Sequence, residues 1–106
     1  MLKISEWLKE TTKGVFLGHL VPRPEIECKD GFTMSVQASS FHYCFPREDL
    51  SDGSYKNVEI GFPSQQEDLI MEYAEDSLNP TDTVYGWVPI EVVEKVIEKH
   101  GGMIDG

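Results

Sequence analysis

Cysteine and histidine are the residue types in this chain that most directly suggest metal or nucleophile chemistry. Cys28, His42 and Cys44, with either His19 or His100, would supply the four nitrogen and sulfur ligands of a tetrahedral zinc site. The spacing lacks a paired Cys-x-x-Cys motif, and a free cysteine is commonly a core residue. We therefore expect neither a metal nor another cofactor.

A nucleophilic pair is the second chemistry that these residues suggest. Cys44 could act with His42 or His100, because a neighbouring base activates a thiol. No third orienting group and no oxyanion-binding pattern accompanies the pair. We therefore expect a protein that is not an enzyme, and we keep a small metalloprotein or enzyme using His42 and Cys44 as an alternative.

Acidic residues are unevenly distributed along the chain. Residues 1–56 carry eight acids and seven bases, whereas residues 57–106 carry eleven acids and two bases. Nearly all of the net charge of −10 therefore lies in the second half. Glu72 and Asp76 would stack four residues apart on a helix, where carboxylates can bind magnesium or transfer protons. Without a nearby lysine or histidine in the sequence, a solvated acidic face is favoured.

A one-signed acidic face attracts a basic partner and speeds the encounter. The low isoelectric point, about 4.5, argues against direct binding to nucleic acid and against an anionic membrane surface. The expected partner therefore has a basic surface. The expected partner-binding residues are Glu67, Asp68, Glu72, Glu75 and Asp76, with Tyr85 and Trp87 as aromatic anchors.

Aromatic residues alternate along two segments of the chain. Phe41, Tyr43 and Phe45 would share one strand face, and Tyr85 and Trp87 would share a face of a later strand. If helices cover only one face of the sheet, these aromatics form an interface. If helices cover both faces, the same side chains belong to the core.

Polar residues near these aromatics suggest a small-ligand pocket. Ser35, Gln37, His42 and Arg47 could line it, and a signalling nucleotide is one candidate ligand. A single arginine is weak support for phosphate binding. A small-molecule or signalling-nucleotide binding protein is therefore the second alternative function.

The elements that must position these residues follow from apolar periodicity. Ile4, Trp7 and Leu8 have helical spacing, which predicts an N-terminal helix that ends near Gly14. Residues 15–21 are apolar on both faces and predict an interior strand.

A hairpin is the most informative local pattern. Two alternating segments flank a turn that contains Gly31. A two-residue loop would mix charged and apolar side chains on each face. A three-residue loop with Gly31 in the left-handed region pairs Cys28 with Phe32 and Ile26 with Met34, and it places all four on one face. We therefore predict this register, with Cys28 in the core.

The second half of the chain predicts more strands and two helices. Residues 39–45, 57–62 and 83–88 have strand patterns. Ser64 followed by Glu67 has the spacing of a capping box, which would open a short helix. An apolar stripe that ends at His100 predicts a C-terminal helix.

These elements predict a single α+β domain over residues 1–106. It would contain an antiparallel or mixed sheet of about five strands, with N-terminal, short middle and C-terminal helices on one face. Charge appears at once after the N-terminus, and no apolar run is long enough to cross a bilayer, so we expect an intracellular protein.

Several motifs make the chain similar to a known group of proteins. They include DGFTMSVQA at residues 30–38, HYC at 42–44, VEIGFPS at 58–64, YAED at 73–76, TVYGWVP at 83–89 and HGG at 100–102. Over roughly residues 22–102 the chain resembles small uncharacterised proteins of phages, prophages and other bacterial mobile elements. The resemblance implies no activity and no site.

The resemblance does imply a genomic setting. Small acidic proteins in that setting often inhibit host defences, including CRISPR effectors and restriction enzymes, and some of them mimic nucleic acid. We therefore expect a non-enzymatic protein in the cytoplasm of a bacterial host. It would bind and block the basic nucleic-acid channel of a defence nuclease through its acidic surface.

Overall fold

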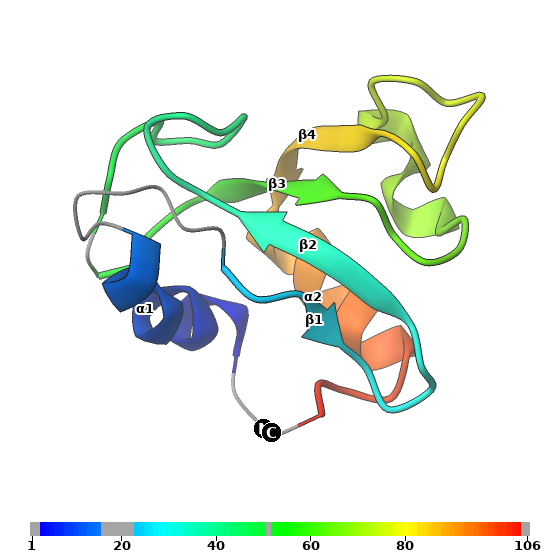
Figure 1. The fold of residues 1–106 in the computed structure, drawn as a ribbon, viewed down its shortest axis with the longest axis horizontal. Helices are drawn as coiled ribbons and strands as arrows, with labels where there is room; N and C mark the ends of the chain where they lie inside the picture. The colour runs from blue at the N-terminus through cyan, green and yellow to red at the C-terminus, as the bar shows by residue number, and fades with distance from the viewer. Residues whose placement is uncertain (1–2, 16–22, 51, 105–106) are drawn as a thin grey trace.

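The chain folds as an antiparallel sheet with helices at its N-terminal and C-terminal ends, as shown by a computed structural model (Figure 1). The structure describes residues 3–15, 23–50 and 52–104. The predicted α+β class is confirmed. The described elements are α1 (Ile4–Val15), β1 (Ile26–Glu27), β2 (Thr33–Gln37), β3 (Asn57–Gly61), the 3-10 helix η1 (Asp68–Tyr73), β4 (Val84–Pro89) and α2 (Ile90–Lys99).

The sheet has the strand order β1-β2-β3-β4, and each strand runs antiparallel to its neighbour. Within the described residues it contains four strands rather than about five. The sequence also predicts a strand over residues 15–21. Val15 is the last residue of α1, and residues 16–21 lie outside the described residues. The predicted strand over residues 39–45 does not form.

The predicted hairpin register is confirmed. Ile26 pairs with Met34, and the Cys28 amide donates to the Phe32 carbonyl at 2.8 Å. Gly31 has a φ of 95°, the left-handed conformation that the three-residue loop requires. Cys28 is fully buried, as the register predicts.

Residues 39–45 form a series of turns instead of a strand. The Ser39 hydroxyl accepts a hydrogen bond from the Phe41 amide at 3.0 Å, and the Ser39 carbonyl accepts one from the Cys44 thiol at 3.2 Å. A serine that bonds to the backbone nearby competes with strand pairing. Phe45 makes only an isolated bridge to Asn57. The alternating pattern of residues 41–45 therefore belongs to a series of turns, in which every second side chain is exposed.

A bulge changes the faces of β4. Val58 of β3 pairs with Val88, whereas Ile60 pairs with Tyr85, so β4 has one extra residue between these pairs. Tyr85 and Val88 are both fully buried, while Trp87 is half-exposed. The prediction that Tyr85 and Trp87 share a face is therefore wrong.

The core lies between the sheet and the helices. The predicted inner stripe of α2 is confirmed, because Val93, Val96, Ile97 and His100 are all buried. In Figure 1, α2 lies behind the sheet. The amide of Ile4 at the start of α1 donates to the Glu94 carboxylate of α2 at 2.7 Å. No helix in the described ranges is long and apolar enough to cross a membrane.

The middle helix begins later than predicted. The capping box at Ser64 does not form, and η1 covers Asp68–Tyr73. Its N-cap is Glu67, whose carboxylate accepts a hydrogen bond from the Leu69 amide at 2.8 Å. The Ser64 hydroxyl instead accepts from the amide of Thr33 at 3.0 Å, and so joins this connection to the start of β2.

Cys28→Ser should lower the free energy of unfolding by about 1–3 kcal/mol, because it places a hydroxyl in the core without an assured partner. Chemical denaturation measures this loss. Cys28→Ala is the control, since it removes the sulfur without adding a polar atom. A serine variant as stable as the wild type would contradict the core assignment.

Candidate functional site

Four exposed aromatic side chains are the most unusual surface feature of the described residues. Phe41 is 67% exposed, Tyr43 37%, Phe45 53% and Trp87 52%. Large aromatic side chains are costly to leave in water. We call these four residues the aromatic surface: a ring contact joins Trp87 to Tyr43, and Phe41 and Phe45 lie two residues before and after Tyr43 in the sequence.

The bulge in β4 joins Trp87 to the turns that carry the other aromatics. The Trp87 amide donates to the Tyr43 carbonyl at 2.9 Å. The two rings stack with centroids 5.1 Å apart. A Cβ atom at Gly86 would lie 3.3 Å from the Tyr43 Cβ, so glycine allows this close approach. The stacked pair is therefore held by both backbone and ring contacts.

Two cations lie over rings of the aromatic surface. The Arg47 guanidinium is 5.5 Å from the centroid of Tyr43, and the Lys56 ammonium is 5.8 Å from that of Phe45. Both distances are within the range of cation–π attraction. Arg47, a predicted ligand-binding residue, thus packs on an aromatic ring.

His42 and Cys44 do not form a nucleophilic pair. His42 Nδ1 lies 2.6 Å from the Ser39 hydroxyl, whereas the Cys44 thiol donates to the carbonyls of Ser39 and Pro46. Burial lowers the pKa of His42 and raises the pKa of Cys44, which disfavours a thiolate. Both residues hold the turns that present the aromatic surface.

The described residues among the candidate metal ligands are not brought together. Within the described residues, no three histidine, cysteine, aspartate or glutamate side chains are placed to hold a metal ion. Cys28 lies in the core, and both ring nitrogens of His100 are bonded to carboxylates. His19 lies outside the described residues.

The predicted pocket residue Gln37 binds the backbone of Arg23, and Ser35 binds Gln37. The Gln37 amide accepts from the Arg23 amide at 2.9 Å and donates to the Arg23 carbonyl at 3.0 Å. It also donates to the Ser35 hydroxyl at 3.1 Å. The buried Arg23 guanidinium in turn donates to the Thr12 hydroxyl and to the Ala38 carbonyl. These hydrogen bonds therefore hold Arg23 in place, just before the start of β1.

Four of the predicted acidic binding residues are exposed, and one is not. Asp68, Glu72, Glu75 and Asp76 are exposed, and we call these four residues the acidic segment. Glu72 and Asp76 do not stack on one helix, because η1 ends at Tyr73. The Asp76 carboxylate instead accepts from the amide of Leu78 and from the side chain of Asn79.

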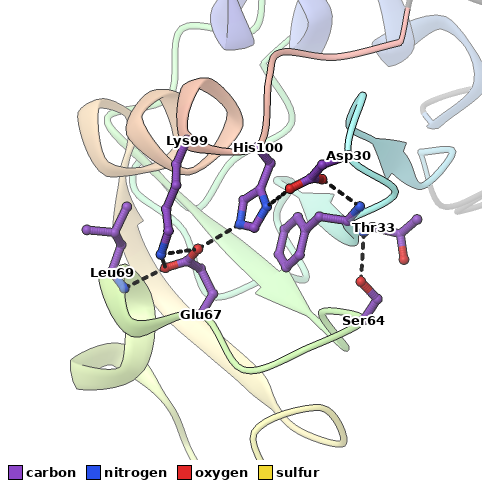
Figure 2. Close-up of polar contacts among 8 residues, drawn as sticks. Asp30, Thr33, Ser64, Glu67, Leu69, Lys99 and His100 are labelled. Atoms are coloured by element: carbon purple, nitrogen blue, oxygen red, sulfur yellow. Dashed lines mark hydrogen bonds and ion pairs between the residues drawn. The ribbon is translucent and has the colours of Figure 1, made fainter.

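Glu67 is only 1% exposed, so it cannot be a surface anchor. Its carboxylate points inward between α2 and the start of η1 (Figure 2). It accepts from His100 Nε2 at 2.8 Å and from the Leu69 amide at 2.8 Å. The Lys99 ammonium lies 3.0 Å from one of its oxygens and 3.1 Å from the other. Burial alone would raise the pKa of Glu67, but these donors lower it below 4.5.

His100 extends this cluster to the hairpin. Its Nδ1 lies 2.6 Å from the Asp30 carboxylate (Figure 2). The imidazole also stacks on the Phe32 ring with centroids 4.1 Å apart. The sequence pattern does not reveal this cluster, because it joins three segments that lie 30 or more residues apart. The only available signal was a histidine at the end of an apolar helical stripe.

Strand β4 connects the two exposed surfaces. At one end the Val84 carbonyl accepts from the Glu75 amide of the acidic segment, and near the other end Trp87 contacts Tyr43. Six residues of strand span about 20 Å. Of the two predicted aromatic anchors, Trp87 is exposed, whereas Tyr85, also in β4, is buried.

No protein-family model matches this chain, and no curated protein and no solved structure matches it either. Function is therefore inferred from the side chains themselves.

Glu67→Gln should lower the free energy of unfolding by about 3 kcal/mol, because it leaves Lys99 and His100 without a buried counter-charge. Glu72→Gln is the matched control, and as an exposed residue it should change stability by less than about 0.5 kcal/mol. Urea titrations of both variants test this. Equal stabilities would mean that Glu67 has no structural role.

Proposed function

We propose that this chain is a non-enzymatic binding protein that docks on a basic surface of another protein. The aromatic surface is the anchor, and the acidic segment attracts the partner. The observation that supports this proposal most directly is the stacked pair of Tyr43 and Trp87, held in place while both rings are exposed.

The aromatic surface has the chemistry of an interface centre. Tryptophan, tyrosine and arginine are enriched among residues that dominate binding energy. Trp87, Tyr43 and Arg47 are in contact before any partner arrives. Preorganised side chains lose less conformational entropy on binding, so a larger share of the contact energy contributes to affinity.

The acidic segment supplies long-range attraction. Residues 59–82 contain seven acids and no base; Glu67 is paired with Lys99 and His100, and the other six acids give a field of one sign. A typical interface buries about 800 Å² on each partner, which corresponds to a patch roughly 30 Å across. A patch of this size is wider than β4 is long, and we propose that one partner contacts both surfaces.

The partner class that we propose is a nucleic-acid-binding protein of a bacterial host. Its phosphate-binding channel is basic, and the carboxylates of Asp68, Glu72 and Glu75 would take the place of phosphates. Inhibition of a defence nuclease of the CRISPR or restriction type, in the host cytoplasm, rests only on the resemblance to phage proteins. The basic channel of such a nuclease is the kind of surface that this charge distribution suits.

Trp87→Asn should weaken binding about thirtyfold, which corresponds to about 2 kcal/mol for an aromatic hot spot. Asparagine tolerates the positive φ of this position, so the fold should survive. Affinity capture from a bacterial lysate identifies the partner, and surface plasmon resonance then measures the affinity. Ile104→Asn is the control, since Ile104 is exposed beside β1 at the opposite edge of the sheet. A partner that binds the Trp87 variant with unchanged affinity would contradict the anchor.

The triple variant Asp68→Asn, Glu72→Gln and Glu75→Gln should lower the association rate more than it raises the dissociation rate. The rate of the wild type should fall with salt, because the Debye length shrinks from about 10 Å at 0.1 M to about 3 Å at 1 M. The rate of the variant should depend less on salt. Rates with equal salt dependence would contradict the role of the acidic segment. Glu67 and Asp76 are left unchanged because both stabilise local structure.

A further inference from the structure

His100 lies between two carboxylates that come from distant parts of the chain. Its Nδ1 faces Asp30 of the hairpin at 2.6 Å, and its Nε2 faces Glu67 at 2.8 Å. Ionised carboxylates only accept hydrogen bonds, whereas a neutral imidazole donates from one nitrogen alone. Both contacts are therefore hydrogen bonds only when His100 carries two protons and a positive charge.

The charges of the cluster balance in that state. Asp30 and Glu67 contribute two negative charges, and His100 and Lys99 contribute two positive charges. Two further titratable groups lie beside the hairpin turn, namely Lys29, which packs near Gly101, and the Cys28 thiol. Burial alone would lower the pKa of His100, but the hydrogen bonds to Asp30 and Glu67 raise it above 6.5.

The two contacts differ in how easily they can be released. Glu67 is 1% exposed, so water cannot replace its hydrogen bond from His100, whereas the Asp30 side chain is 47% exposed and can turn to solvent. When His100 loses a proton, the remaining N–H should stay with the buried Glu67, because an unsatisfied buried carboxylate costs more. The contact to Asp30 is therefore the one that opens.

We propose that His100 is a proton-controlled clasp, which holds the Asp30 hairpin to the end of α2 when charged and releases the hairpin when neutral. The hairpin has additional bonds to this region, because the Asp30 amide donates to the His100 carbonyl and the Lys29 amide donates to the Gly102 carbonyl. Release is thus a local loosening of residues 29–32 and 100–102. It does not rest on the proposed function, since no partner takes part.

The direction of the pH dependence follows from the raised pKa of His100. The clasp opens least at low pH, where His100 is charged whether or not it contacts Asp30. As the pH rises past the pKa that His100 has without the Asp30 contact, the equilibrium constant for opening rises by up to tenfold per pH unit until the pH passes the higher pKa of the closed form, and it is then constant. Both carboxylates stay ionised throughout this range, because the pKa of Asp30 and that of Glu67 are lowered.

Amide hydrogen exchange of the intact chain between pH 5.5 and 8.5 tests the clasp. After correction for intrinsic base catalysis, the amides of Asp30 and Phe32 should lose several-fold protection over the pH range in which His100 titrates. The NMR signals of the His100 ring follow that titration. The Leu69 amide should keep its protection, because it donates to Glu67 on the side that stays closed. Protection of Asp30 and Phe32 that does not change with pH would overturn the proposal, and so would an equal loss at Leu69.

Two variants separate the clasp from other titrating groups. His100→Gln keeps a donor near the position of Nε2 but none toward Asp30, so exchange at Phe32 should be fast and independent of pH. Asp30→Asn should lower the pKa of His100 and move the transition to lower pH. His42→Gln is the control and should leave the transition in place. A transition that persists in His100→Gln would overturn the proposal.

Discussion

A buried carboxylate needs hydrogen-bond donors or cations as partners. The buried Glu67 therefore determines how the elements at one end of the molecule are joined. Its oxygens require donors, and these come from the Leu69 amide, from Lys99 and from His100. His100 in turn needs an acceptor for its second nitrogen, which Asp30 supplies. The hairpin, η1 and α2 are therefore joined by one chain of charged hydrogen bonds. Because Glu67 points inward, the acids that follow it along η1 point outward.

A second buried ion fixes the other end of β2. The Arg23 guanidinium has hydroxyl and carbonyl partners, and Gln37, the last residue of β2, binds the Arg23 backbone through both polar atoms of its amide. β2 is thus held at its start by the hairpin cluster and at its end by Arg23. The turns that carry the aromatic surface begin directly after this second anchor. Their position is consequently set by a buried polar network, although their exposed rings contribute little to the core.

The sequence predicts structure well where the deciding interactions are local. The hairpin register follows from five neighbouring apolar residues and one glycine, and the stripe of α2 follows from its own periodicity. Glu67 was misassigned because its burial depends on His100, which is 33 residues away. The same limit applies to β4, where one inserted residue reverses the alternation after Tyr85. The exposure of the four acids follows from local polarity, whereas the exposure of Trp87 depends on the bulge, and the positions of Tyr85 and Gln37 depend on tertiary packing.

Backbone strain gives an independent reason to associate Trp87 with binding. Its φ is 51°, and a left-handed conformation costs a residue with a side chain about 1–2 kcal/mol. Phe62, the other such residue among those described, is also an exposed aromatic. Burial of the Trp87 ring does not offset this strain energy in the isolated chain, because the ring remains about half exposed to water. Asparagine or glycine would satisfy the backbone with less strain. Since local rules are broken most often where function requires it, the strain at this bulge supports our proposal that the Trp87 side chain contacts a partner.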